Sequence, residues 1–106
     1  MNPTIAADYA EVGRWLRIFA TSHAKRENAH VEAEVGTTGD REGRAYGLRV
    51  VLAGRAAPPW DESPIELTLG DVADGRTRFA WCESLAQRVR AFARALVVQA
   101  AAVRPS

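Results

Sequence analysis

Residues 75–106 read GRTRFAWCESLAQRVRAFARALVVQAAAVRPS, and this segment carries the strongest structural signal in the chain. Its apolar residues recur at steps of three and four, which at about 100° per residue places them on one face of a helix. The stripe consists of Phe79, Cys82, Ala86, Val89, Ala93, Leu96, Ala100 and Val103, and it is widened by Leu85 and Phe92. The segment therefore predicts a long amphipathic helix that covers part of a core.

The same segment is strongly basic. Residues 75–106 have a formal net charge of +5, whereas residues 1–74 have a net charge of −4, so the whole chain comes to +1. The near-neutral total thus conceals a basic C-terminal helix on an acidic body. Such an asymmetry restricts the partners of the protein without identifying one.

Another helix is predicted at the other end of the chain, over residues 2–24. Its apolar stripe consists of Ile5, Tyr9, Val12, Leu16, Phe19 and His23. Asn2 before Pro3 offers an N-cap with proline at the first helical position. Gly13 costs this helix up to about 1 kcal/mol relative to alanine, unless a neighbour packs closely against it.

Between the two helices, three segments alternate apolar and polar residues with the period of two that is typical of strands. These strands are predicted at residues 29–35, 45–53 and 65–69. Residues 54–63, GRAAPPWDES, are predicted to lack regular structure because Pro58 and Pro59 remove two backbone donors. Residues 70–75, GDVADG, are predicted to form a turn before the last helix.

The order helix, three strands, helix predicts an α+β fold in one domain over residues 1–106. Consecutive strands with short connections favour an antiparallel sheet, because parallel strands need long crossovers. Both helices can then cover the apolar face of this three-stranded sheet, which gives a two-layer sandwich. On this arrangement, Leu48→Ala should cost about 2–5 kcal/mol by leaving a cavity, whereas Thr68→Ala should be nearly neutral.

Composition and length favour a soluble, cytoplasmic protein. Cys82 is the only cysteine, which excludes an internal disulfide. The N-terminus lacks the basic and apolar regions of a signal peptide. The longest nearly apolar run, residues 91–103, is too short to cross a bilayer. We therefore expect no membrane partner.

One metal-ligand pattern is present. His30, Glu32 and Glu34 alternate on the predicted first strand, and an imidazole with two carboxylates can bind a divalent ion. Residues two apart on a strand are separated by about 6.6 Å, so these three side chains would converge poorly on one ion. We interpret them as a solvated sheet face and expect no metal.

A thiol nucleophile is the other catalytic possibility, with His23 or His30 as the base for Cys82. Cys82 lies on the apolar stripe, where cysteine behaves as a small hydrophobic residue. A reactive thiolate requires an electropositive and partly exposed setting. We expect Cys82 to be buried and unreactive, and we predict no catalytic residue and no cofactor. The sequence leans away from an enzyme, and an enzyme with an unrecognised site is kept as the third alternative.

The arginines suggest nucleic-acid or other polyanion binding as one function. The candidates for phosphate contact are Arg76, Arg78, Arg88 and Arg94. The helix–three strands–helix order is similar to that of double-stranded-RNA-binding domains, in which a basic last helix contacts phosphate. Those domains carry a lysine-rich signature where this chain reads GRTRFAWCESLAQ, so the resemblance is confined to topology.

The favoured function is a non-enzymatic protein–protein interaction or homodimerising module. Trp15 and Ile18 lie off the main stripe of the first helix, and Trp60 lies in the proline-containing connection. Tryptophans near arginines are typical of interfaces. A three-stranded sheet covers little area, so we expect these three residues to bind a second copy or another protein. The alternatives are that Trp15 and Ile18 widen the buried face of the helix and that Trp60 folds back over the edge of the core.

Overall fold

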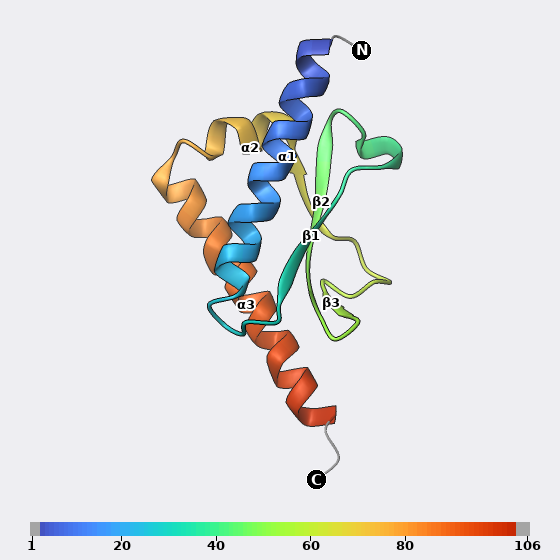
Figure 1. The fold of residues 1–106 in the computed structure, drawn as a ribbon, viewed down its shortest axis with the longest axis vertical. Coiled ribbons are helices and arrows are strands. Elements are labelled where there is room, and N and C mark those ends of the chain that lie inside the picture. Colours follow the sequence, from blue (N-terminus) through green and yellow to red (C-terminus); the bar gives the residue numbers. More distant parts are fainter. Residues whose placement is uncertain (1–2, 104–106) are drawn as a thin grey trace.

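The computed structural model of the chain describes residues 3–103. The elements follow the order α1 (Pro3–Ala24), β1 (Glu32–Gly36), a 3₁₀ turn η1 (Gly39–Arg41), β2 (Ala45–Leu52), β3 (Arg55–Ala57), β4 (Ile65–Thr68), α2 (Leu69–Gly75) and α3 (Phe79–Val103). This order confirms the α+β class with helices at both ends of the chain (Figure 1). Asn2 and Arg104 lie outside the described residues, as do the side chains of Ile5 and Val103.

The sheet is antiparallel and is built around β2. One edge of β2 pairs with β1, and the other edge pairs with both β3 and β4. The two short strands lie at opposite ends of β2, because Leu52 pairs with Arg55 whereas Leu48 pairs with Ile65. The third predicted strand is therefore a split edge strand, with residues 58–64 making an excursion between its two parts.

The prediction that residues 54–63 lack regular structure was wrong at its start. Ala53 and Gly54 both have positive φ, at 51° and 80°, which is the backbone of a tight two-residue hairpin turn. The chain therefore reverses at once and pairs Arg55–Ala57 with β2 before Pro58 stops the strand.

The predicted turn at residues 70–75 is instead the short helix α2. Thr68 supplies its N-cap, since the Thr68 Oγ1 accepts a hydrogen bond from the Asp71 amide at 3.1 Å. Thr68→Ala is consequently not a neutral change. Gly70 and Gly75 had suggested a turn, but a good N-cap and close packing of this segment stabilise the helix.

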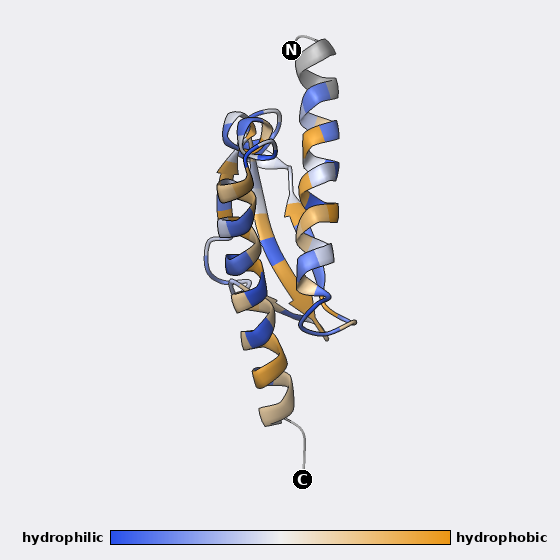
Figure 2. Cartoon of the chain, turned by 90° about the vertical axis from the view of Figure 1, so that its left-hand side faces the viewer, coloured by the Kyte–Doolittle hydropathy of each residue, from blue (hydrophilic) through white to orange (hydrophobic). Residues whose placement is uncertain are grey.

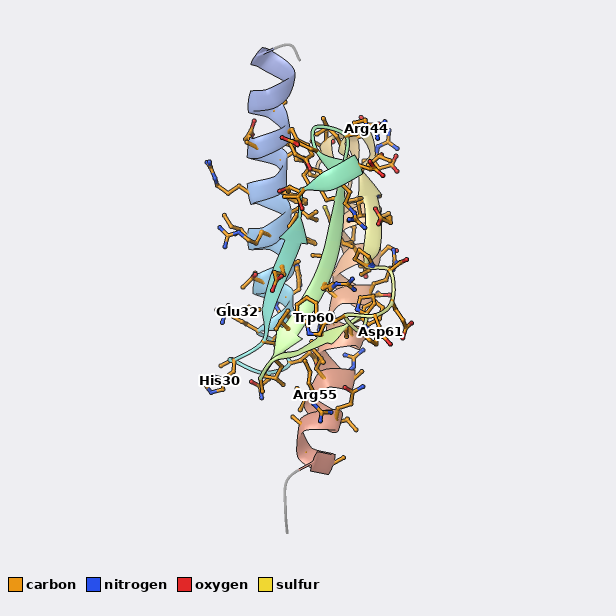
Figure 3. All side chains as sticks on the ribbon, turned by 90° about the vertical axis from the view of Figure 1, so that its right-hand side faces the viewer. His30, Glu32, Arg44, Arg55, Trp60 and Asp61 are labelled. Carbon is orange, nitrogen blue, oxygen red and sulfur yellow. The ribbon has the colours of Figure 1, made fainter. Side chains whose placement is uncertain are left out.

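Both long helices lie on the same face of the sheet, as predicted (Figures 2 and 3). α1 packs mainly on β1, α3 packs on β2 and β3, and the helices also contact each other. The core between the layers includes Val12 and Leu16 from α1, Leu48 from β2, and Val89 and Leu96 from α3. The opposite face of the sheet carries no helix among the described residues.

Tyr46 of β2 joins the two layers. Its ring stacks on Tyr9 with 4.7 Å between the centroids, and its hydroxyl donates a hydrogen bond to the Tyr9 carbonyl at 2.7 Å. The Tyr9 hydroxyl in turn donates to the Ala45 carbonyl at 2.6 Å. A Cβ placed on Gly13 would come within 2.9 Å of the Tyr46 Cε1. Glycine at this position therefore lets α1 approach the sheet closely.

α1 also covers the outer edge of β1. The Ala33 amide donates a hydrogen bond to the Thr21 Oγ1 at 3.1 Å, in place of a bond to another strand. Ala20 and Ala24 are completely buried on this helix, whereas Phe19 and His23 of the predicted stripe are only half-buried. Ala20 and Ala24 thus pack closely at this end of α1, and Phe19 and His23 lie at its border with α3.

The last turns of α3 extend past the end of the sheet (Figure 1). Residues 95–103 read ALVVQAAAV, so this end of the helix is apolar on nearly every side. Within residues 3–103, no helix is long and apolar enough to cross a membrane.

Candidate functional site

A groove of about 420 Å³ lies between the C-terminal half of α1 and the N-terminal half of α3. Its lining comes from both helices and, through Arg26, from the turn that follows α1, and it consists of Phe19, His23, Arg26, Phe79, Cys82, Glu83, Ala86, Gln87 and Arg90. These residues recur at steps of three and four along each helix, so they form the facing sides of the pair. The small side chains of Cys82 and Ala86 leave space beside Phe19.

An aromatic cluster supports one side of this groove. Trp15 stacks on Phe19 with 4.9 Å between the centroids, and Trp81 lies 6.4 Å from Trp15. Phe19 also contacts the His23 imidazole, with 4.6 Å between the ring centroids. Trp15 therefore packs within its own chain and is only half-exposed.

His23 is held in an electrostatically unfavourable place for a cation. Burial lowers the pKa of His23, and the nearby guanidinium groups of Arg26 and Arg90 lower it further. The Nδ1 atom of His23 is buried and has no hydrogen-bond partner among the described residues. The imidazole is therefore neutral near neutral pH and retains an unused polar atom.

Glu27 links the end of α1 to α3 just beside the groove. Its Oε2 accepts hydrogen bonds from the Arg90 Nε at 2.8 Å and from the Arg94 Nη1 at 3.4 Å. These bonds, chiefly the one from Arg90, lower the pKa of Glu27. Arg26 is exposed and forms no ion pair with a described side chain.

Cys82 is half-buried in the groove rather than fully buried. Its Sγ lies 3.5 Å from the Gly75 carbonyl and 3.7 Å from the Arg76 carbonyl, so the thiol donates to the backbone. His23 lines the same groove, whereas His30 lies in the turn before β1 and not on the strand face. Among residues 3–103, no cluster of histidine, cysteine and acidic side chains has the arrangement of a metal site.

Trp60 lies on the open face of the sheet, away from the helices (Figure 3). The Arg49 guanidinium is 5.6 Å from the Trp60 ring centroid and donates to the carbonyls of Pro58, Pro59 and Glu62. The Trp60 indole donates to the Gly54 carbonyl at 3.0 Å. Arg49 thus holds the excursion of residues 58–64 against the sheet, and Trp60 remains 52% exposed.

The three residues predicted to bind a partner are consequently not on one surface. Ile18 is 58% exposed on the outer side of α1, Trp15 is packed against Phe19, and Trp60 is on the far side of the sheet. Sequence reasoning missed two further exposed apolar residues, Phe79 at 81% and Val98 at 67%. Both belong to α3, and Phe79 was predicted to lie in the buried stripe.

The arginines predicted to bind phosphate are also dispersed. Arg76 pairs with Glu11 at 3.2 Å, and Arg78 pairs with Asp74 at 3.5 Å. Arg88 is exposed and forms no ion pair with a described residue, but it lies six positions from Arg94, which is about 120° around the helix. Polyanion binding therefore stays a prediction without a shared surface.

A second depression lies beside η1 and is larger, but its arginines are already engaged within the chain. Arg41 pairs with Glu66, and Arg44 donates to the Asp40 carbonyl at 2.8 Å. The groove between α1 and α3 is the site that combines apolar walls with an unused polar atom.

No protein-family model, curated protein or solved structure matches this chain significantly.

Proposed function

We propose that this chain is a non-enzymatic interaction module that self-associates through the outer face of its helical layer. Three of the four large apolar side chains most exposed among the described residues lie on α1 and α3, namely Ile18, Phe79 and Val98. This concentration on one layer is the observation that carries the proposal. Exposed apolar groups that gather on one face are typical of surfaces that bind another protein.

Charge also favours contact between copies. The chain has a formal charge of only +1, so two molecules repel each other weakly at neutral pH. Several arginines of the helical layer are neutralised within the chain, among them Arg76 by Glu11 and Arg90 by Glu27. We also propose that the protein works in the cytoplasm, where the thiol of Cys82 stays reduced.

Light scattering combined with gel filtration tests self-association. The wild type should exceed the monomer mass at micromolar concentrations, and Ile18→Glu should weaken association by about tenfold or more because it places a charge in an apolar contact. Ile18 is the suitable position because its exposed side chain can be changed without disturbing the core. Trp15→Glu would instead disrupt the stack with Phe19.

Trp60→Glu is the matched control, since it introduces the same charge on the opposite face. Its mass distribution should equal that of the wild type. A wild type that is monomeric at all accessible concentrations would refute self-association. If Ile18→Glu and Trp60→Glu changed the mass distribution equally, the contact between copies would not lie on the helical layer in particular.

A further inference from the structure

The groove between α1 and α3 has the properties of a small-molecule site. Its volume of about 420 Å³ falls in the range of ligand pockets in proteins, which is roughly 300–1,000 Å³. The lining includes the rings of Phe19 and Phe79 together with the small side chains of Cys82 and Ala86. Flat apolar walls favour an aromatic body over a polar or flexible one.

The polar groups at the groove favour an anion. Two guanidinium groups, those of Arg26 and Arg90, line it against one carboxylate, that of Glu83. The Arg90 Nε donates to Glu27, which leaves the terminal amino groups of Arg90 available to a ligand. Arg26 forms no ion pair with a described side chain. Guanidinium groups bind carboxylates with two parallel hydrogen bonds, a geometry that Arg26 can offer in full.

His23 supplies an independent observation. Its side chain lines the groove, and its buried Nδ1 has no hydrogen-bond partner in the described part of the chain. A buried polar atom without a partner is unfavourable, and a rotation of the imidazole that turned this nitrogen toward a polar group of a bound molecule would relieve that cost. His23, with its unpartnered nitrogen, and Arg26, with its unpaired guanidinium, thus line the same groove.

We infer that this groove binds a small aromatic carboxylic acid. Its ring lies in the groove beside Phe19, Cys82 and Ala86. Its carboxylate is held by Arg26 and by the free amino groups of Arg90, within reach of His23. This function goes beyond self-association, and it requires no second copy of the chain.

The test uses 1-naphthylacetate as the probe and 1-naphthylacetamide as its uncharged analogue. Cys82 is the only cysteine, so the rate of its alkylation by iodoacetamide reports on the groove alone. Saturating 1-naphthylacetate should slow this alkylation by about fivefold or more, and the amide should bind about tenfold more weakly because it lacks the charge. The measurement is made on Ile18→Glu as well as on the wild type, so that a failure of self-association leaves the result intact.

Arg26→Gln should weaken binding of 1-naphthylacetate by about tenfold, since it removes the unpaired guanidinium. Arg17→Gln is the control, because it makes the same change of charge on α1 in the depression beside Val35 and Thr37, on another side of the helix. Arg26 and Arg17 are both exposed, so neither substitution disturbs the core.

Three results would overturn the inference. The first is the absence of saturable protection of Cys82 up to the solubility of the probe. The second is equal binding of the acid and the amide, which would leave an apolar groove without anion selectivity. The third is an equal loss in Arg17→Gln and Arg26→Gln, which would indicate a general effect of charge.

Discussion

Tyr46 shows how one residue can fix the distance between two layers. It is completely buried, its ring is stacked between elements, and its hydroxyl satisfies a helix carbonyl. Burial raises the pKa of Tyr46 to about 12, so the hydroxyl stays protonated and remains a donor to Tyr9 throughout the ordinary pH range. The position of Gly13 against this ring makes the contact sensitive to a single methyl group.

Gly13→Ala should destabilise the protein by about 1–3 kcal/mol, because the added Cβ meets the Tyr46 ring in a packed core. This loss exceeds the gain of up to about 1 kcal/mol from helix propensity. The control is Gly70→Ala in α2, where a Cβ would meet nothing within 4 Å. That change should be neutral or stabilising by up to about 1 kcal/mol. The expectation would be contradicted if urea unfolding gave the same free energy of unfolding for both variants.

From the sequence, Gly13 was expected to cost the helix stability unless a neighbour packed closely against it. The sequence did not identify that neighbour, because the contact joins residues 33 positions apart and depends on the rotation of α1 about its own axis. Phe79 illustrates the same difficulty. Its spacing places it on the apolar stripe, but as the first residue of α3 its side chain points back beyond the body of the helix.

α2 is the element that the sequence misassigned as a turn, and its cap was visible in the residues. Thr68 is followed three positions later by Asp71, and this spacing of a hydroxyl and an acid is typical of a helix N-terminus. The two glycines of GDVADG favoured the prediction of a turn over the helix that the capping residues indicate. A short helix depends more on its capping and packing than on its intrinsic propensity.

Thr68→Ala should cost about 1 kcal/mol, because it removes the acceptor for the Asp71 amide at the start of α2. Ser63→Ala is the control, since Ser63 is exposed in the excursion of residues 58–64. Thermal unfolding should show a lower midpoint for Thr68→Ala only. A midpoint equal to that of Ser63→Ala would mean that the cap contributes nothing.

The strands show which features a periodic pattern can and cannot disclose. The alternation of Tyr46, Leu48 and Val50 gave the central strand and its buried face correctly, because one wet and one dry side impose the period of two. The pairing of Arg55–Ala57 depends on a two-residue turn at Ala53 and Gly54. A left-handed alanine is unusual there, so the residues themselves gave no clear hairpin signal.

At the scale of the whole molecule, Glu27 ties the two helices together through Arg90 and Arg94. The pKa of Glu27 is lowered in the folded protein, so its contribution to stability is present above its unfolded pKa near 4.5 and is lost as the pH falls further. Glu27→Gln should therefore be less stable than the wild type at pH 7, and the difference should shrink below about pH 4.5.

Glu34→Gln provides the comparison for that measurement. Glu34 is exposed on the open face of the sheet and forms no ion pair with another described residue. The difference in stability between Glu34→Gln and the wild type should change little between about pH 3 and 7, as measured by chemical denaturation. A constant difference between Glu27→Gln and the wild type across this range would show that the link does not depend on charge.

The candidate site was only partly predictable at this scale. Ile18 lay off the apolar stripe of α1, and it is exposed as that position requires. The groove was not foreseen, because it forms between α1 and α3. All the strands lie between these two helices in the sequence. His23 and Cys82 were weighed as a base and a thiol nucleophile and then placed on the apolar stripes of their helices, and Arg90 was not singled out.

Both edges of the sheet are partly blocked to the addition of foreign strands. Thr21 occupies the Ala33 amide on the β1 side, and the opposite edge offers only segments of three and four residues, interrupted by residues 58–64. A growing fibril requires an unbroken row of free amides and carbonyls as its template. The backbone thus directs molecules that meet at high concentration toward contacts between side chains, which are reversible, and away from polymerisation.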